Sequence, residues 1–413
     1  MMSKKSPQLR FEGFTDDWEE RKLSSISERV TRKNKNNEST LPLTISAQDG
    51  LIDQNDFFNK QVASRDVTGY FLVKNGEFAY NKSYSNGYPW GAIKRLDKYD
   101  MGVLSTLYIV FRPTEINSQF LVSYYDTTRW YREVSKNAAE GARNHGLLNI
   151  APTDFFNTLL VVPKIVDEQE KIGSFFKQMD NTIALHQRKL DLLKEQKKGY
   201  LQKMFPKNGE KVPELRFAGF ADDWEERKLS DVANHKGGTA IEKYFDKDGV
   251  YKVISIGSYG LNSQYVDQNI RAISNEITDG RVVNSGELTM VLNDKTANGT
   301  IIGRSLLVEQ DNEYVINQRT EIISPKETFD SNFAYTILNG SFREKVKRIV
   351  QGGTQIYVNY PAVSNLNLEL PKIEEQQKIG SFFKQIDETI ALHQRKLDLL
   401  KEQKKGFLQK MFV

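Results

Sequence analysis

The 413-residue sequence contains no cysteine, which excludes disulfide bonds, thiolate metal sites and a cysteine nucleophile. Such a composition suits a reducing compartment, and we expect the protein to work in the cytoplasm. No apolar run approaches the roughly 18 residues that a membrane-spanning helix needs. The charged segment from Met1 to Phe11 also lacks the apolar core of a secretory signal. We therefore expect no membrane association and no signal peptide.

An excess of charge of one sign is also missing. The chain has 58 Lys and Arg residues against 54 Asp and Glu residues, which leaves a net charge of only +4. A protein that wraps DNA unaided is usually more basic than this. A DNA partner would therefore require local positive charge, or positive charge supplied by other subunits.

Familiar catalytic motifs are absent as well. The sequence has no phosphate-binding G-x-x-x-x-G-K-[ST], no G-x-G-x-x-G after a strand and no H-E-x-x-H. Its four histidines, His145, His186, His235 and His393, show no metal-ligand spacing. The string Val358-Asn359-Tyr360-Pro361 lacks the paired prolines of the N-P-P-Y motif of amino-methyltransferases. We predict no catalytic residue and no metal site, and the absences favour binding over catalysis.

What the sequence does contain is a long internal repeat. Residues 7–24 read PQLRFEGFTDDWEERKLS and residues 213–230 read PELRFAGFADDWEERKLS, and between 172–205 and 379–412 only three positions differ. The stretches between these blocks have diverged almost completely. Identical blocks suggest a common partner, and divergent modules suggest two different ligands of one kind. Recent recombination without functional asymmetry is the alternative.

Each divergent module has the pattern of an α+β fold. Short apolar runs separated by Gly, Asn and Asp predict strands, and helical stretches are expected at 120–136 and 333–350. Asn75-Gly76-Glu77 and Ser285-Gly286-Glu287 occupy matching places, which indicates a shared fold. The aromatic blocks around Trp18 and Trp224 are expected to pack against their modules.

Two long helices are predicted downstream of Pro163 and Pro371, the first with Asp167 as its N-cap. A helix of about 38 residues is about 57 Å long. Its apolar series steps by four and three, as in a heptad seam, and is interrupted at His186 and Lys197. The residues predicted to pair the helices are Ile172, Phe176, Met179, Ile183, Leu190, Leu193, Ile379, Phe383, Ile386, Ile390, Leu397 and Leu400.

Antiparallel pairing would close this coiled coil within one chain. The expected architecture is therefore α+β: two globular modules in tandem, separated by two long antiparallel coiled-coil helices with pseudo-two-fold symmetry. The predicted boundaries are 1–163 for module 1, 164–206 for the first helix, 207–371 for module 2 and 372–413 for the second helix.

Candidate DNA contacts combine basic and amide side chains with nearby aromatics and glycine. Two glycine-containing loops, Gly141–Gly146 and Gly352–Gln355, follow the predicted module helices at equivalent places, where glycine lets backbone approach a ligand. Solvated faces and ordinary turns are the alternative interpretation. The candidates are Asn81, Lys82, Ser83, Tyr84, Arg95, Arg129, Arg132, Arg143, Asn144, Lys295, Thr296, Asn298, Arg304, Arg319, Lys347, Arg348, Thr354 and Gln355.

Each half opens with P-x-L-R-F-x-G-F-x-x-x-W-E-x-R-K-L. The second half closes with P-x-I-x-E-Q-x-K-I-G-x-F-F, and the first closes with the same motif plus one extra residue before its E-Q. With two variable modules and two conserved helices, the whole chain resembles the specificity subunit of type I restriction–modification systems. The resemblance implies that each module is a target recognition domain reading one half of a bipartite, asymmetric site in double-stranded DNA. The helices would set the spacer between the half-sites and dock two methylation subunits.

The resemblance further implies that this chain is non-catalytic and binds no cofactor itself. S-adenosylmethionine for adenine methylation would lie on the methylation subunits, and ATP and Mg²⁺ would lie on restriction subunits that translocate DNA. Two other functions remain open from the residues alone. One is a structural adaptor whose modules bind proteins or glycans on a coiled-coil rod, and the other is a self-contained nuclease or methyltransferase.

Overall fold

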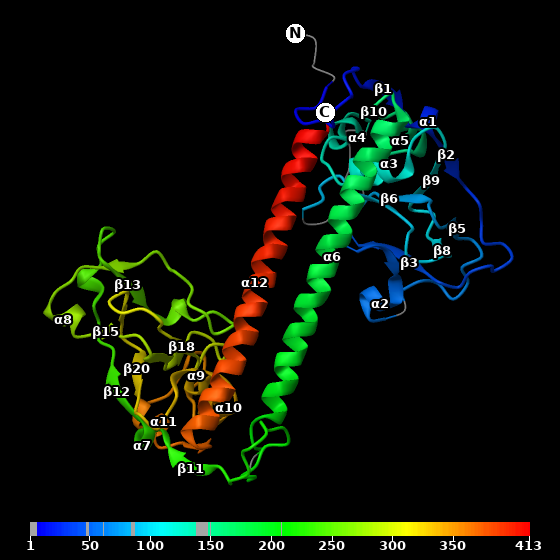
Figure 1. Cartoon of the computed structure of the whole chain (residues 1–413). Coiled ribbons are helices and arrows are strands. Elements are labelled where there is room, and N and C mark those ends of the chain that lie inside the picture. Colours follow the sequence, from blue (N-terminus) through cyan, green and yellow to red (C-terminus); the bar gives the residue numbers. More distant parts are fainter. Residues whose placement is uncertain are drawn as a thin grey trace. The chain divides into compact units, whose positions relative to one another are not determined.

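The chain folds into two compact units, each built around one divergent module. Unit 1 comprises Met1–Gln187 with Arg395–Val413, and unit 2 comprises Arg188–Gln394. The structure, a computed structural model, describes residues 6–46, 49–60, 62–83, 87–137, 148, 150–207 and 209–413. Each unit therefore contains one module, the start of one long helix and the end of the other (Figure 1).

The module of unit 1 is built on a four-stranded antiparallel sheet in the order β2-β9-β6-β7. Its elements are β1 (Glu19–Lys22), α1 (Leu23–Ile26), β2 (Ser27–Val30), β3 (Leu43–Ser46), β4 (Gly50–Asp53), α2 (Gln54–Phe58), β5 (Phe71–Lys74), β6 (Phe78–Asn81), β7 (Ala92–Arg95), β8 (Met101–Leu104), β9 (Ile109–Pro113), α3 (Ser118–Tyr125), α4 (Tyr131–Asn137), α5 (Pro152–Phe156) and β10 (Leu159–Val162). The pairs β1-β10, β3-β4 and β5-β8 flank this sheet.

The module of unit 2 has a sheet of the same kind in the order β12-β20-β16-β18. Its elements are β11 (Glu225–Lys228), α7 (Leu229–Val232), β12 (Ala233–Gly237), η1 (Glu242–Tyr244), β13 (Tyr251–Ile254), η2 (Ile256–Ser258), β14 (Arg271–Ala272), α8 (Glu276–Asp279), β15 (Val282–Val283), β16 (Leu288–Val291), β17 (Asn293–Asp294), β18 (Ser305–Leu307), β19 (Tyr314–Ile316), β20 (Thr320–Pro325), α9 (Ser331–Asn339), α10 (Ser341–Arg348), β21 (Gln351–Gly352), β22 (Ile356–Tyr357), α11 (Tyr360–Ser364) and β23 (Asn367–Leu370).

The two modules share this topology although their sequences have diverged, so the prediction of a common fold is confirmed. The turns that precede β6 and β16 also correspond, and in them Gly76 and Gly286 adopt φ of 83° and 84°. The prediction of one continuous helical stretch in each module is wrong, because each stretch is divided into two helices. Residues 126–130 separate α3 from α4, and Gly340 separates α9 from α10.

The two long helices are present as predicted. They are α6 (Val166–Lys203) and α12 (Ile373–Met411), with 38 and 39 residues. Asp167 was expected as the N-cap of the first, but it lies within the first turn, where its charge favours the helix N-terminus.

Within each unit the two helix segments run antiparallel, as predicted. In unit 1 the Phe175 and Phe407 ring centroids lie 5.1 Å apart, and Lys404 Nζ lies 2.6 Å from an Asp180 carboxylate oxygen. A shift of 207 residues turns these pairs into the corresponding pairs of unit 2. There the Tyr200 and Phe382 centroids lie 5.0 Å apart, and Lys197 Nζ lies 2.5 Å from an Asp387 carboxylate oxygen. The lysines that interrupt the apolar seam therefore pair with aspartates of the facing helix.

The ends of the long helices also belong to the cores of the modules. Ile172 and Phe176 of α6 and Phe412 beyond α12 are buried in one apolar cluster with Trp18 and Phe120. The corresponding cluster of unit 2 contains Phe205, Trp224, Phe333, Ile379 and Phe383. The packing predicted for Trp18 and Trp224 is confirmed, and it fixes each module to both helices.

The remaining predicted pairing residues follow the same seam. Leu190 and Leu397 are each 1% exposed. Half-buried positions along the two helices are Met179, Ile183, Leu193, Ile386, Ile390 and Leu400.

Candidate nucleic-acid interface

Both modules bring two distant loop segments together in the same way. In unit 1 the Leu148 amide donates a hydrogen bond to the Lys82 carbonyl at 2.9 Å, next to the end of β6. In unit 2 the Val358 amide donates to the Leu292 carbonyl at 2.9 Å, next to the end of β16. The segment after the module helices thus meets the loop that follows a central strand in each module.

In unit 2 a buried carboxylate accepts hydrogen bonds from backbone amides of the loop after β17. Asp294, 3% exposed, accepts hydrogen bonds from the amides of Thr296 and Ile301 at 2.9 and 2.8 Å. Burial alone would raise the pKa of Asp294, but these hydrogen bonds lower it below its ordinary value. The carboxylate therefore stays ionised and organises the loop.

Arg343 stabilises the same loop through its guanidinium group. Its guanidinium, on a residue 7% exposed, donates to the carbonyls of Gly299, Thr300 and Ile302 at 2.8 to 2.9 Å. Burial lowers the pKa of Arg343 to about 10. Because its guanidinium already donates to three backbone carbonyls, Arg343 stabilises the loop and is not available to bind DNA.

The glycine loop of unit 2 forms the other side of this surface. β22 pairs with both β17 and β21, so Gln351–Tyr357 and Asn293–Asp294 form one small antiparallel sheet. Gly352 has φ of 97°, and a Cβ on it would lie 2.2 Å from the Gln355 carbonyl oxygen. Only glycine fits here, and the tight turn leaves Thr354 exposed at the tip.

The structure therefore assembles one exposed polar surface from segments about 60 residues apart in the sequence. Its members are the predicted residues Lys295, Thr296, Asn298, Thr354 and Gln355. Amide and hydroxyl side chains of this kind form hydrogen bonds with base edges, and lysine adds a contact to guanine or phosphate. The surface has the chemistry of direct base recognition.

A polar hollow adjoins this surface and contains residues that the sequence did not single out as ligands. It is lined by the predicted Arg319, which is exposed with φ of 69°, together with Asn293, Tyr357 and Asn359. Asn359 falls within the string that was compared with the methyltransferase motif. A usable signal was its place immediately after the glycine loop.

His235 lies near the wall of this hollow. Its Nδ1 is 2.6 Å from a Glu321 carboxylate oxygen, and its ring centroid is 4.4 Å from that of Tyr360. Burial raises the pKa of Glu321, and the contact with His235 opposes that rise. Tyr360 and Glu321 line the hollow itself, so the pair positions its wall.

In unit 1 the predicted residues at the end of β6 are half-buried. Burial lowers the pKa of Lys82, whose Nζ lies 3.5 Å from the Ile150 carbonyl oxygen. Asn81 accepts a hydrogen bond from the Ser83 amide at 3.0 Å. The predicted Tyr84, Arg143 and Asn144 lie outside the described residues.

The other predicted arginines differ in how free their guanidinium groups are. Arg95 binds Asp97, Ser118 and Gln119, with 14% of its side chain exposed, so it is occupied within the module. Arg304 donates to the Thr300 carbonyl and to Ser263, and burial lowers its pKa. Of the remaining predicted cations, Arg132 and Arg348 are exposed, and the exposed Arg129 donates to the Gln409 carbonyl at 2.9 Å. Lys347 is half-exposed and pairs with Glu344 at 2.8 Å.

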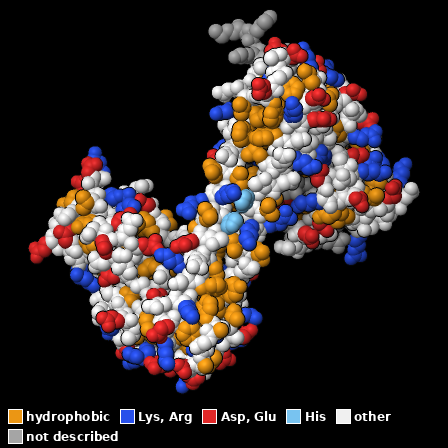
Figure 2. Space-filling view, in the orientation of Figure 1, with side chains coloured by type: hydrophobic (Ala, Val, Ile, Leu, Met, Phe, Trp, Pro, Cys, Tyr) orange, Lys and Arg blue, Asp and Glu red, His pale blue; other side chains and the backbone are white. Residues whose placement is uncertain are grey.

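Charge over the molecular surface is mixed. Figure 2 shows Lys and Arg side chains interspersed with Asp and Glu on the visible face of both units. Among the described residues, no group of three or more His, Cys, Asp and Glu side chains could hold a metal ion. No helix in that same part of the chain is long and apolar enough to cross a membrane.

Comparison with known proteins agrees with this architecture. A family model described as the type I restriction modification DNA specificity domain matches residues 221–402. The type I restriction enzyme MjaVIII specificity subunit of Methanocaldococcus jannaschii is 25% identical over 274 residues. Over these residues the chain is similar to type I specificity subunits. The alignment covers 64% of this chain and 63% of the length of that relative.

Solved structures of type I restriction–modification proteins share the fold of this chain. The type I S subunit from M. genitalium superposes with a TM-score of 0.63 at 12% identity, covering 99% of each chain. A chain from a type I R-M system studied for complex assembly and conformational transition gives a TM-score of 0.50 at 16% identity, covering 96% of this chain and 97% of its own. The alternative of an adaptor that binds no DNA is not favoured.

Proposed function

We propose that this chain is the DNA sequence-recognition subunit of a type I restriction–modification complex. Each module would read one half of a bipartite, asymmetric site. The observation that carries the proposal is the shared loop assembly, in which the same hydrogen bond, Leu148 to Lys82 and Val358 to Leu292, holds loops of unrelated sequence. One scaffold that carries loops of different sequence fits two different half-sites.

The long helices would set the spacer between the half-sites and dock two methylation subunits. Four leucines on them, Leu185, Leu192, Leu392 and Leu399, are between 52% and 60% exposed. Leu392 and Leu399 are the repeat counterparts of Leu185 and Leu192. Matching exposed apolar positions on each helix support two copies of one partner, because identical surfaces select identical ligands.

The chemistry of the complex would reside on its partners. S-adenosylmethionine would be bound by the methylation subunits, and ATP and Mg²⁺ by restriction subunits, whereas this chain would be non-catalytic by itself. The purified chain with S-adenosylmethionine and DNA should give no methylation until the methylation subunits are added. Methylation by the chain alone would instead support a self-contained methyltransferase.

The proposed recognition function is tested with a random duplex library. The purified chain, with its methylation subunits, should enrich a bipartite motif with a fixed spacer. Replacing 207–371 with the module of another family member should change one half of the motif and leave the other half and the spacer unchanged. Failure to enrich any bipartite motif would contradict the proposal.

The spacer function of the helices needs a separate variant. Inserting four residues into α6 shifts the heptad seam by about a full helical turn. We expect a changed spacer length or a failure to assemble with the methylation subunits. An unchanged motif from a normally assembled complex would show that the helices do not set the spacer.

A further inference from the structure

Each unit contains a basic cavity between its module and the end of one long helix. The cavity of unit 1 has a volume of about 560 Å³ and is lined by the cations Lys94, Arg129, Lys401, Lys404 and Lys405. The cavity of unit 2 has a volume of about 740 Å³ and is lined by Lys194, Lys197, Lys198, Lys207, Lys345 and Arg348. Three lysines of α6 are thus the repeat counterparts, 207 residues apart, of three lysines of α12.

These two cavities concentrate positive charge in a chain that has little overall. Asp126 is the one carboxylate among the described residues that line the first cavity, and Glu344 is the one among those that line the second. The chain as a whole has a net charge of only +4. The local excess is what a DNA-binding member of a larger complex requires.

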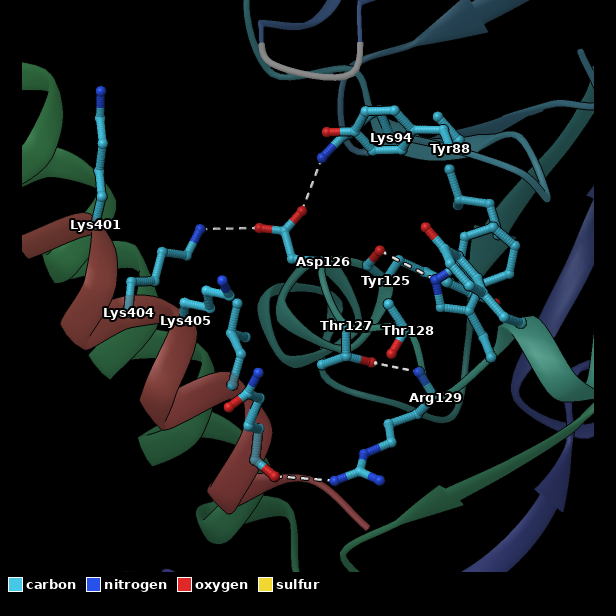
Figure 3. A pocket seen from close by; sticks show the side chains of 16 residues that line it. Tyr88, Lys94, Tyr125, Asp126, Thr127, Thr128, Arg129, Lys401, Lys404 and Lys405 are labelled. Atoms are coloured by element: carbon cyan, nitrogen blue, oxygen red, sulfur yellow. Dashed lines mark hydrogen bonds and ion pairs between the residues drawn. The ribbon is translucent and has the colours of Figure 1, made fainter. Parts of the chain in front are cut away.

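The lysines that line a cavity differ in whether they pair with a carboxylate. In unit 1, Lys404 points to the Asp126 carboxylate at 3.0 Å, and Lys94 binds the same carboxylate at 2.7 Å (Figure 3). Burial opposes the charge of Lys404, but Asp126 and Asp180 raise its pKa above the ordinary value. Lys401 and Lys405 are exposed, and within the described chain neither has a carboxylate partner within 4.0 Å.

The cavities adjoin the loops that carry the candidate base contacts. Tyr88, which lines the first cavity, lies in the same β6–β7 connection as Lys82 and Ser83. Arg348, which lines the second, ends α10 four residues before the glycine loop begins at Gly352. Residues that line each cavity are therefore close in sequence to the loop that carries candidate base contacts.

We propose that the two cavities bind backbone phosphates of duplex DNA, one beside each half-site. This inference rests on the recognition function proposed above. Phosphate contacts fix register and orientation without reading sequence. The backbone is chemically the same at both half-sites, which explains why identical lysines serve modules whose reading surfaces differ.

The two sites are unequal. Counted from the N-caps of α3 and α9, the position of Asp126 corresponds to Asn339, which lines the cavity of unit 2. Each cavity is lined by one carboxylate, Asp126 or Glu344, but Glu344 pairs with Lys347 outside the lining, and unit 2 has six lining cations against five in unit 1. We expect the unit 2 cavity to contribute more to DNA affinity.

The test uses the chain assembled with its methylation subunits and two matched double variants, K194Q with K198Q and K401Q with K405Q. DNA affinity is measured against salt concentration for a cognate duplex and for an unrelated duplex. Each variant should weaken binding to both duplexes by a similar factor and reduce the salt slope by about 0.9 for each phosphate that the variant no longer neutralises. The effect of the unit 2 variant should be the larger, and the methylated sequence should not change.

The control is K189Q with K396Q, which removes two repeat-related exposed lysines that do not line either cavity. A salt slope equal to that of the control would overturn the phosphate proposal, and an unchanged bipartite methylation pattern would show that the recognition function stands. Loss of the methylation subunits during size-exclusion chromatography would also overturn it, because the cavities would then dock protein. No bipartite pattern with the wild-type complex would overturn both.

Discussion

Arg10 donates two hydrogen bonds from its guanidinium to the carboxylate of Glu168, at 2.6 and 2.8 Å. The Glu168 side chain is fully buried, and the Trp18 indole N–H also donates to it at 3.3 Å. Arg216 and Glu375 form the same bidentate pair in unit 2, at 2.7 and 2.8 Å. The L-R-F block and the E-Q block of the repeat are thus two halves of one contact that fixes each module to the first turn of a long helix.

Removing one side of this contact should be costly. Arg10→Ala leaves the buried Glu168 carboxylate without its cation, and we expect a loss of about 3–5 kcal/mol in unfolding free energy. Chemical denaturation measures it. Arg21→Ala is the control, because Arg21 forms an exposed pair with Glu19 worth about 0–1 kcal/mol. Equal effects of the two substitutions would contradict the structural role of the Arg10 pair.

Two glycines of the long helices should not tolerate a methyl group. A Cβ on Gly173 would lie 2.7 Å from the Phe120 amide nitrogen, and one on Gly380 would lie 2.6 Å from the Phe333 amide nitrogen. Gly173→Ala and Gly380→Ala should each destabilise their unit by about 1–3 kcal/mol.

The same helices supply the control for these glycines. Gly199 and Gly406 are related by the repeat, and a Cβ on either would meet nothing within 4 Å. Alanine at these two positions should stabilise the helix by about 0.5–1 kcal/mol. Thermal denaturation should therefore move the two pairs of variants in opposite directions, and shifts of the same sign would refute the packing argument.

The buried seam of the helices can be separated from their exposed face. Leu190→Asp and Leu397→Asp place a charge at positions that are 1% exposed, and we expect a loss of several kcal/mol in stability. Leu192→Asp and Leu399→Asp change residues that are 52% and 58% exposed and should alter stability by less than about 0.5 kcal/mol. Circular dichroism during unfolding measures both.

The exposed leucines give that experiment a second measurement. If they dock the methylation subunits, Leu192→Asp and Leu399→Asp should keep the fold and lose the partner in a pull-down. Retention of the partner by both variants would remove these residues from the docking surface.

The glycine loop of unit 2 predicts a change in recognition without a change in overall stability. Gly352→Ala forces the loop open, because its Cβ would meet the Gln355 carbonyl oxygen, whereas a Cβ on Gly353 would meet nothing within 4 Å. We expect Gly352→Ala to weaken discrimination in one half-site and Gly353→Ala to leave it nearly intact. Motif enrichment with each variant is the measurement, and loss of discrimination in both half-sites would argue against a local role.

The scaffold could be predicted from the sequence because its determinants are periodic or repeated. The seam through Leu190 and Leu397 follows from heptad spacing, and the paired modules follow from the duplicated blocks. Antiparallel pairing followed from the order of modules and helices. The position of Ile172 in a module core could not be predicted in this way, because an apolar stripe does not reveal whether another helix or a module covers it.

The recognition surface could be predicted only by residue type. Lys295 and Gln355 were chosen for chemistry, and the pairing of β17 with β22 that brings them together has no local sequence signal. Arg95 was also chosen for its chemistry, but its guanidinium contacts Ser118 and Gln119 within the module. Nothing in the sequence around Arg95 indicates these contacts. Asp294 and Arg343 were not identified from the sequence as residues that support the loop. Their side-chain types alone do not distinguish a residue that supports a loop from one that binds a ligand.

Gly173 and Gly380 have a consequence beyond stability. Each accepts the first turn of a module helix, which is capped by Asn117 in one unit and by Asp330 in the other. The long helices therefore accept a capped helix end and an aromatic residue in the same way twice, beside the Arg10–Glu168 and Arg216–Glu375 pairs. If each module reads one half-site, as proposed, a single recombination event that keeps these contacts would exchange one half of the recognised sequence without compensating mutations elsewhere.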